Sequence, residues 1–330
     1  MRETALIIVR FRNVLHRCLR LASIPLLLHP LVPAAQNFPS HPLRMITPSP
    51  PGGSVDFLSR TVSQHLARVF GVPVIVDNRA GASAVIGTEL LAKSPADGYT
   101  LMLVYSTHAT NPIFITKLPY DTLNDFASVV HVGDIPLLLV VHPSVPAASA
   151  RELIALAKAR PGQLQFAAGA AGGGPSMAGL LLRQLAGVDV VQVSYKGNAP
   201  ALTDVLGGQV TMMFDTINTS IGLAKAGKLR ALAVTSTKRS SLAPELPTMI
   251  EAGLPGFDVR AWFGVLAPAR TPREIIQKLN AEINRGLSDP ATRTRLSADG
   301  VELVGGTPAE FDRFIRAEMA RWPKIIKTGG

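Results

Sequence analysis

The amino-acid sequence predicts an α/β protein with two lobes, each a mainly parallel sheet flanked by helices. A strand, a glycine-bearing loop and a helix follow one another repeatedly, and the series starts again near residue 137. The strands are short, near-continuous apolar runs, which is typical of parallel strands covered on both faces. At 330 residues the chain is long enough for about two domains. With 47% hydrophobic and 17% charged residues, it has the composition of a well-buried globular protein.

The first lobe is predicted from three strands and the helices between them. Apolar residues at spacings of three and four predict its first helix, which Gly71 and Pro73 end. These apolar residues are Val55, Leu58, Val62, Leu66 and Val69. The predicted strands are 43–46, 74–76 and 99–105, a second helix covers 84–93, and the loops after the strands are 48–54, 77–83 and 106–109.

The second lobe repeats this pattern. Its first helix begins with a capping box, Ser149-Ala-Arg-Glu152, and extends to about residue 158. The other predicted helices are 175–185, one that ends at 206 and one that follows 216. The predicted strands are 137–141, 164–168, 189–195, 210–214 and 229–235, and the loops after strands are 169–174, 195–198 and 215–216.

A strand at 261–266 is expected to return the chain to the first lobe. Two helices follow, and each is predicted to start at a threonine N-cap, Thr271 or Thr307, with proline at N1 and glutamate at N3. The expected lobes are therefore 38–137 together with 262–330, and 138–261.

The net charge of +10 does not predict a nucleic-acid-binding protein. Residues 1–37 carry five arginines and one glutamate, which leaves 28 basic and 22 acidic residues in the remainder. Those charges are scattered singly, and no aromatic residues interleave with them as a base-stacking surface requires. A mild positive field that favours anionic ligands is the better interpretation.

The N-terminus predicts a signal peptide over residues 1–35. Arginines precede an apolar stretch at 21–28, and Val32 and Ala34 fit the small-residue rule for cleavage between Ala34 and Gln36. The alternative, a membrane anchor, needs about 20 continuous apolar residues, which this segment lacks. Cys18 is the only cysteine, so the exported chain is expected to be a soluble periplasmic monomer without a disulfide or a thiolate metal site.

The loops that follow the parallel strands predict the ligand site. Such loops share one edge of a sheet, and ligands of open α/β sheets bind at that edge. We expect 48–54, 77–83 and 106–109 to face 169–176, 195–198 and 215–218 across an interlobe cleft. Several of these loops also present helix N-termini, which suit anions. The candidate ligand-binding residues are Pro51, Gly52, Gly53, Ser54, Ser83, Ser106, His108, Gly169, Gly174, Ser176, Lys196, Asp215 and Thr216.

Alternatives stay open for several of these residues. Each glycine cluster, taken alone, equally fits a tight turn. Asp215, like Asp77, fits a buried acid that caps its own loop as well as a ligand contact, and His108 fits a satisfied loop histidine. Lys196 fits either an anion contact or a solvated lysine.

Enzyme signals are missing from the sequence. It contains no nucleophile elbow, no His-Glu-x-x-His, no phosphate loop and no dinucleotide fingerprint. We therefore expect no enzyme, no cofactor and no metal. The alternative is an enzyme that acts on a small anion in the same cleft. A regulatory co-inducer domain is a third reading, but it needs a DNA-binding helix-turn-helix that residues 1–37 do not provide.

From about Phe38 onward the sequence resembles the substrate-binding receptors of tripartite tricarboxylate transporters, the Bug receptors. Many separate motifs occur in the same order as in that family. They are Pro50-Pro-Gly-Gly-Ser-Val-Asp56, Val76-Asp-Asn-Arg79 with Gly81, Ala92-Lys-Ser-Pro-Ala-Asp-Gly-Tyr-Thr-Leu101, Val193-Ser-Tyr-Lys-Gly197, Asp204-Val-Leu-Gly-Gly-Gln209, Phe214-Asp215, Pro247-Thr-Met249 and Trp262-Phe-Gly264.

The resemblance implies a type II periplasmic-binding-protein (Venus-flytrap) fold, with interlobe crossings near 137–141 and 259–264. It also implies that the loop 51–54 grips one carboxylate of a di- or tricarboxylate, an acidic amino acid or an aromatic carboxylate. The implied partners are the two integral-membrane subunits of such a transporter, or a sensor protein. Ser49, Ala80, Ser83 and Met177 depart from the family pattern; Met177 stands where a histidine is usual, which puts a small hydrophilic ligand in doubt.

Overall fold

A mixed ten-stranded sheet organises the described part of the chain, which is residues 38–327 of this computed structural model. The predicted signal peptide lies outside these residues. The strands are β1 (Leu43–Thr47), β2 (Val74–Asn78), β3 (Thr100–Tyr105), β4 (Phe126–Val141), β5 (Gln165–Ala168), β6 (Val191–Ser194), β7 (Met212–Thr216), β8 (Arg230–Val234), β9 (Arg260–Pro268) and β10 (Glu302–Gly305). The α/β fold class predicted from the sequence is confirmed.

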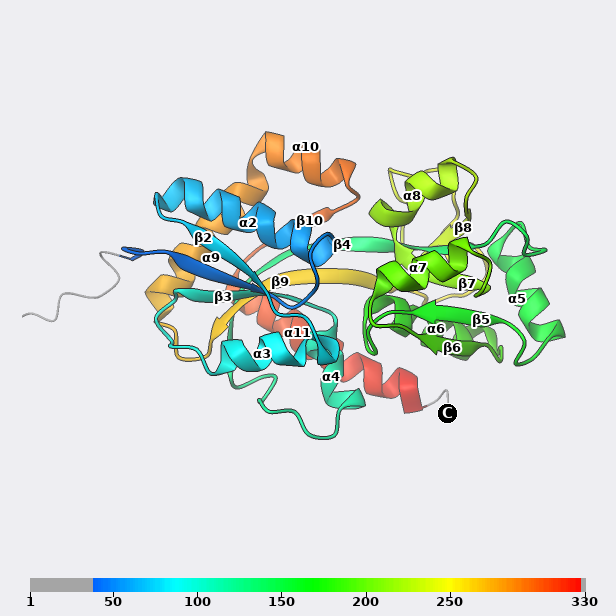
Figure 1. Ribbon diagram of the computed structural model, residues 1–330, viewed down its shortest axis with the longest axis horizontal. Helices are drawn as coiled ribbons and strands as arrows, with labels where there is room; N and C mark the ends of the chain where they lie inside the picture. Colours follow the sequence, from blue (N-terminus) through cyan, green and yellow to red (C-terminus); the bar gives the residue numbers. More distant parts are fainter. Residues whose placement is uncertain (1–37, 328–330) are drawn as a thin grey trace, which may run out of the picture. The chain divides into compact units, whose positions relative to one another are not determined.

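Helices follow most of these strands (Figure 1). They are α2 (Ser54–Phe70), the one-turn 3-10 helix η2 (Ala82–Ala84), α3 (Val85–Ala92), α4 (Thr107–Phe114), α5 (Ala150–Ala159), α6 (Gly174–Ala186), α7 (Asn198–Leu206), α8 (Ile217–Lys225), α9 (Arg273–Ser288), α10 (Pro290–Ala298) and α11 (Pro308–Lys327). No helix within the described residues combines the length and apolar character needed to cross a bilayer.

Strand β4 belongs to two halves of the sheet. Phe126–Pro136 pair with β9, whereas Leu137–Val141 pair with β7. We call β1, β2, β3, β9, β10 and the first part of β4 the first half-sheet, and β5 to β8 with the rest of β4 the second half-sheet. Figure 1 shows β4 continuing from one half into the other.

Three parallel strands form the site-bearing part of each half-sheet. β1 lies between β2 and β3, and β5 lies between β6 and β7, all in parallel register. Parallel strands place their carboxyl ends at one edge. The loops that follow β1, β2 and β3 therefore share one edge, and those that follow β5, β6 and β7 share another.

The core of the first half-sheet explains the Trp262-Phe-Gly264 motif. Trp262 is 2% exposed, and its ring meets the Phe311 ring edge to face with centroids 6.0 Å apart. A Cβ atom at Gly264 would lie 2.0 Å from an atom of the Phe311 ring. Only glycine lets α11 pack this closely on β9.

Three local predictions were wrong. Residues 106–109 are no loop, because α4 begins at Thr107 and the Ser106 carbonyl already accepts from the Ala109 N–H at 3.1 Å. Residues 215–216 are the end of β7 rather than a loop. Thr271 is not an N-cap, since Pro272 occupies that position and its carbonyl accepts from the Ile276 N–H.

The other two predicted caps are confirmed. The Ser149 side chain accepts from the Glu152 N–H at 3.2 Å. Thr307 and Glu310 form a reciprocal capping box: the Thr307 N–H donates to Glu310 Oε2 at 2.7 Å, and the Glu310 N–H donates to Thr307 Oγ1 at 3.2 Å. The sequence analysis missed α10, β10 and the first eleven residues of β4.

Candidate ligand-binding site

Three of the helices at the strand ends begin on glycine and are not capped by a side chain. Within residues 38–327, the N-caps of α2, α6 and α7 are Gly53, Gly173 and Gly197, and none of the three helices has a side-chain cap hydrogen bond. The first N–H groups of a helix have no partner inside the helix. No side-chain cap therefore uses the N–H groups of these three helix starts, and the positive dipole end of each favours an anion; the start of α6 is buried, whereas Gly53 is exposed.

The loop between β1 and α2 is held in place by Asp56. Its Oδ2 accepts from the Gly52 N–H at 3.1 Å and from Arg60 Nε at 3.0 Å, and its Oδ1 accepts from Asn78 Nδ2 at 2.9 Å. Asn78 Nδ2 also donates to the Ser49 carbonyl at 3.0 Å. Burial alone would raise the pKa of Asp56, but the hydrogen bonds from Arg60, Asn78 and Gly52 lower it below its ordinary value. The ionised carboxylate thus fixes the loop that carries Gly53.

Space beside this loop is open. Pro51, Gly52 and Gly53 are exposed, and among the described residues no atom lies within 4 Å of a Cβ placed on Gly53. Gly52 has a φ of +93°, a conformation that glycine adopts without strain. A carboxylate can therefore approach the backbone at the start of α2.

Hydrogen bonds join the loop edges of the two half-sheets at two places. Ser54, the first residue of α2, accepts at Oγ from Asn218 Nδ2 in the first turn of α8 at 3.2 Å. Thr110 Oγ1 in α4 donates to the Gly172 carbonyl at 2.7 Å. The strand-end loops of the first half-sheet thus meet those of the second.

The strand-end loops of the second half-sheet also pack on each other. A Cβ atom on Gly169 would lie 2.3 Å from Asn198 Oδ1, so the loop after β5 touches the first residue of α7. Gly174 is buried at the first position of α6. Ser176 is 2% exposed, and its Oγ lies 3.4 Å from Gln192 Oε1 of β6. This packing places the loop after β5 against the start of α7, and the first turn of α6 against β6.

The candidate residues divide into an exposed and a buried group. Pro51, Gly52, Gly53 and Lys196 are exposed, and Ser54 and Ser83 are half-buried. The buried candidates are Ser106, His108, Gly169, Gly174, Ser176, Asp215 and Thr216.

His108 lies in the core of the first half-sheet. It is 3% exposed, and its ring meets the Phe126 ring edge to face with centroids 5.2 Å apart. Burial lowers the pKa of His108 to about 4, so the ring is neutral near pH 7. This placement fits a core histidine better than a ligand contact. The ring is not fully satisfied, because its Nδ1 has no hydrogen-bond partner within the described residues.

The Asp215 carboxylate is engaged inside the protein. It is 1% exposed, and its Oδ2 accepts from Thr219 Oγ1 and from Ser220 Oγ, the latter at 2.5 Å. Burial raises the pKa of Asp215 above its ordinary value. Side chains in α8 therefore engage this carboxylate, which fits the alternative of a buried acid held within its own segment better than a ligand contact. Thr216 Oγ1 lies beside it, 3.1 Å from Thr219 Oγ1.

Sequence reasoning did not single out four polar residues that hold these loops: Asn78, Thr110, Asn111 and Asn218. Asn78 stands inside the Val76-Asp-Asn-Arg79 motif, and Asn218 lies in the window 215–218, so both had a signal. Thr110 and Asn111 had none, because the helix that carries them was expected to be a loop.

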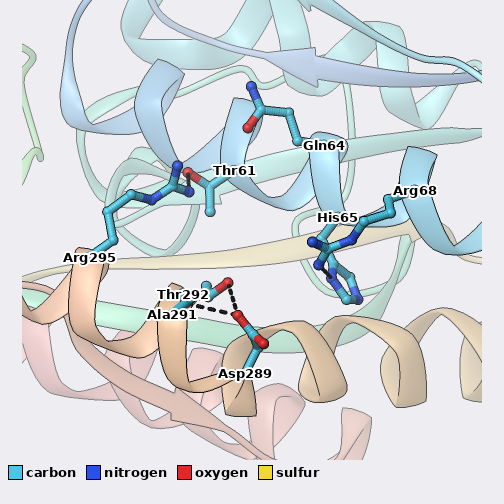
Figure 2. A pocket seen from close by; sticks show the side chains of 8 residues that line it. All are labelled: Thr61, Gln64, His65, Arg68, Asp289, Ala291, Thr292 and Arg295. Atoms are coloured by element: carbon cyan, nitrogen blue, oxygen red, sulfur yellow. Dashed lines mark hydrogen bonds between the residues drawn. The ribbon is translucent and has the colours of Figure 1, made fainter.

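The cavity drawn in Figure 2 lies between α2 and α10, away from the strand-end loops. It has a volume of about 360 Å³, and its polar groups bind one another. Arg295 donates to Thr61 Oγ1 at 3.1 Å, Arg68 donates to His65 Nδ1 at 3.1 Å, and Asp289 accepts from the Thr292 N–H at 2.9 Å. The hydrogen bond from Arg295 to Thr61 joins α10 to α2 beside this cavity, which is not part of the strand-end loops. No group of three or more metal-ligating side chains lies together in the described part of the chain.

The mixed sheet with helix starts at two facing loop edges defines the class of periplasmic binding proteins. A solved structure described as periplasmic binding protein BugD superposes with a TM-score of 0.82 at 30% identity, and covers 89% of this chain and 99% of that one. A family model described as "Tripartite tricarboxylate transporter family receptor" matches residues 58–330. The chain belongs to this family of solute-binding receptors.

Relatives and neighbours agree with this assignment. Protein BugT of Bordetella pertussis is 40% identical over 299 residues, which are 90% of this chain and 92% of that protein. The structure titled "R. palustris Rpa4515 with adipate" has a TM-score of 0.85 at 37% identity, covering 89% of this chain and 98% of that one. MatC from Rhodopseudomonas palustris, with bound malate, has a TM-score of 0.81 at 31% identity, covering 88% of this chain and all of that one.

Proposed function

We propose that this chain is an extracytoplasmic receptor, not an enzyme, that captures a small dicarboxylate between its two half-sheets. The observation that carries the proposal is the set of helix starts without side-chain caps at the two facing loop edges. The N–H groups at the start of α2 bind one carboxylate, and those at the starts of α6 and α7 receive the other. The neighbours with bound adipate and malate support this ligand class.

Electrostatics favours an anion at this place. Lys196 is exposed directly before Gly197, the N-cap of α7. The acids nearest the site, Asp56 and Asp215, are already engaged by internal hydrogen bonds. The proposed cleft thus combines donors and a cation with acids whose oxygens are occupied.

The enzyme alternative has less support. His108 is buried against Phe126, and Asp215 is held by Thr219 and Ser220. General acid–base chemistry requires such groups within reach of the substrate. A receptor needs only the donors that the helix starts supply.

The finer parts of the function follow from membership of the family. We propose that residues 1–35 direct export to the periplasm and that the lobes are 38–137 with 262–330, and 138–261. We expect these lobes to close on the ligand, since the chain passes between them only within β4 and again just before β9. The closed monomer then delivers its ligand to the two membrane subunits of a tripartite tricarboxylate transporter, or to a sensor.

Thermal unfolding with a panel of carboxylates tests the proposed ligand class. Adipate and malate are the first probes, and the uncharged diamide of adipate is the control. A ligand at 100 times its Kd adds about 2.7 kcal/mol of stability, which raises the Tm measurably. The proposal fails if no di- or tricarboxylate, acidic amino acid or aromatic carboxylate raises the Tm.

A further inference from the structure

Helix α4 carries two neighbouring polar side chains that reach loops of different half-sheets. Thr110 and Asn111 are 0% and 1% exposed. Asn111 Nδ2 donates to the Ser83 carbonyl, in the loop after β2, at 2.9 Å. Thr110 Oγ1 donates to the Gly172 carbonyl, in the loop after β5, at 2.7 Å. One turn of α4 therefore contacts a strand-end loop on each side of the proposed cleft.

We propose that Thr110 is a positioning residue for ligand binding, and this proposal rests on the proposed receptor function. Its hydrogen bond to Gly172 holds the loop 169–173, and with it the N-terminus of α6, against the first half-sheet. The start of α6 then faces the start of α2 at the separation that the bound ligand requires. Thr110 itself need not touch the ligand.

The Thr110 hydroxyl can release this loop at little cost. It has a single hydrogen and two acceptors, the Gly172 carbonyl at 2.7 Å and the Ser106 carbonyl of its own helix at 3.2 Å. When the half-sheets separate, the hydroxyl turns to Ser106 and keeps a partner, while water reaches Gly172. No buried donor is left unsatisfied in either state, which is what a reversible contact needs.

Gly172 is shaped for this contact. Its φ is +74°, a conformation that side chains rarely adopt. A Cβ atom there would lie 2.4 Å from Thr110 Oγ1 and 3.1 Å from the Phe114 ring. Only glycine brings its carbonyl this close to α4, so the pair Thr110 and Gly172 acts as one unit.

Three variants separate the hydroxyl from the shape of the side chain. Thr110→Val keeps the shape and removes the donor, and Thr110→Ser keeps the donor. Thr61→Val is the control, because Thr61 is also a buried helical threonine that donates to the carbonyl four residues earlier, at 3.0 Å. Its hydroxyl likewise has a second partner, Arg295, but it lies in α2 away from the loops. Calorimetry with adipate as the probe measures the Kd of each.

We expect Thr110→Val to weaken adipate binding by about 2- to 10-fold, the effect of one lost hydrogen bond. Thr110→Ser restores binding to within about twofold, and Thr61→Val leaves it unchanged. If Thr110 had only a structural role, Thr110→Val would lower the Tm, and Thr110→Ser would not differ from it in affinity for adipate. If Thr110→Val does not fold, Thr110→Ala is measured against Thr110→Ser instead. Equal affinities for the donor and donor-free variants overturn the proposal.

A second measurement needs no ligand. Ser54 Oγ and Asn218 Nδ2 are 3.2 Å apart across the half-sheets, so Ser54→Cys with Asn218→Cys, in a Cys18→Ser background, reports their approach through the rate of disulfide formation. Thr110→Val should slow this rate by about 2- to 10-fold, and Thr110→Ser should not. An unchanged rate with Thr110→Val overturns the positioning role. If Thr110→Val slows disulfide formation but the unmodified protein binds no carboxylate, the proposed receptor function is wrong. The role of Thr110 in holding the two half-sheets together would still be supported.

Discussion

Helices at the candidate site and helices elsewhere begin in different ways. The starts of α2, α6 and α7 have glycine N-caps without a side-chain cap, whereas α5 and α10 are capped by Ser149 and Asp289. Thr307 and Glu310 cap each other at the start of α11. The helix α9, whose N-cap is Pro272, is the exception away from the site.

This difference shows where the chain uses its capping residues for stability. A side-chain N-cap contributes about 1 kcal/mol relative to alanine, and a few tenths of a kcal/mol relative to glycine. Where a ligand would be bound, a protein side chain in the same position would compete with the ligand for the N–H groups. Three consecutive non-glycine residues with positive φ, Ala82, Ser83 and Ala84, lie at the same loop edge. Such conformations cost about 1–3 kcal/mol each and cluster at functional sites. Missing side-chain caps and strained backbone therefore both lower the stability of this loop edge.

Installing a cap at the site should produce the largest effect. Gly53 has a φ of −92° and a ψ of 175°, the backbone of an ordinary N-cap, so Gly53→Asp fits without strain. Its carboxylate would take the donors of α2 and repel an anionic ligand. We expect the Kd for adipate to rise at least about 100-fold, while the free energy of unfolding stays within a few tenths of a kcal/mol.

The control for this variant is Gln163→Glu, which adds the same charge at an exposed turn before β5. Calorimetry and thermal unfolding on both proteins measure the effect. Tight adipate binding by Gly53→Asp would contradict the role assigned to the bare helix start.

Acid should destabilise the protein through the buried His108. Burial depresses the pKa of His108 from 6.5 to about 4, so the unfolded chain binds the proton more readily than the folded one. The contribution of His108 to the free energy of unfolding is therefore fully present above about pH 6.5, and it is lost as the pH falls toward 4. From pH 7 to pH 4.5 the loss is about 2–3 kcal/mol.

Urea unfolding at the two pH values measures this loss, and His108→Gln should show a smaller difference between them. The same variant distinguishes a core residue from a ligand contact. If His108 is a core residue, His108→Gln should lower the free energy of unfolding by more than it lowers the free energy of adipate binding. The opposite result would indicate that His108 contacts the ligand.

Removing a cap away from the site should have the smallest effect. Thr307→Ala and Ser149→Ala each lose about 1 kcal/mol of stability, because each removes a side-chain acceptor from a helix start. The affinity for adipate should not change. A loss of affinity in either variant would show that stability and binding are not divided between these two groups of helices.

Much of the fold was predictable because its signals are local. The apolar spacing of 55–69 and the capping residues at Ser149 and Thr307 report on neighbours within a few positions, and the structure confirmed each. The glycine-bearing loops after the strands could also be predicted from the sequence. Their convergence follows from the common edge of parallel strands, which needs no knowledge of particular contacts.

Other features depended on residues far apart in the chain. Residues Phe126–Pro136 form a strand because β9, more than 120 residues later, pairs with them. Thr110 meets Gly172 and Ser54 meets Asn218 across sequence separations of 62 and 164 residues. No local pattern marks such pairs.

The sequence by itself determined the α/β class, the strand-end glycines and two of the three predicted caps. Only the tertiary structure decided which polar residues are available to a ligand. His108, Asp215 and Met177 are 3%, 1% and 1% exposed, while Gly53 and Lys196 remain at the surface. Exposure depends on what packs over a residue: the ring that meets His108 belongs to Phe126 of β4, whereas the hydroxyls that engage Asp215 come from the helix α8 that follows it directly.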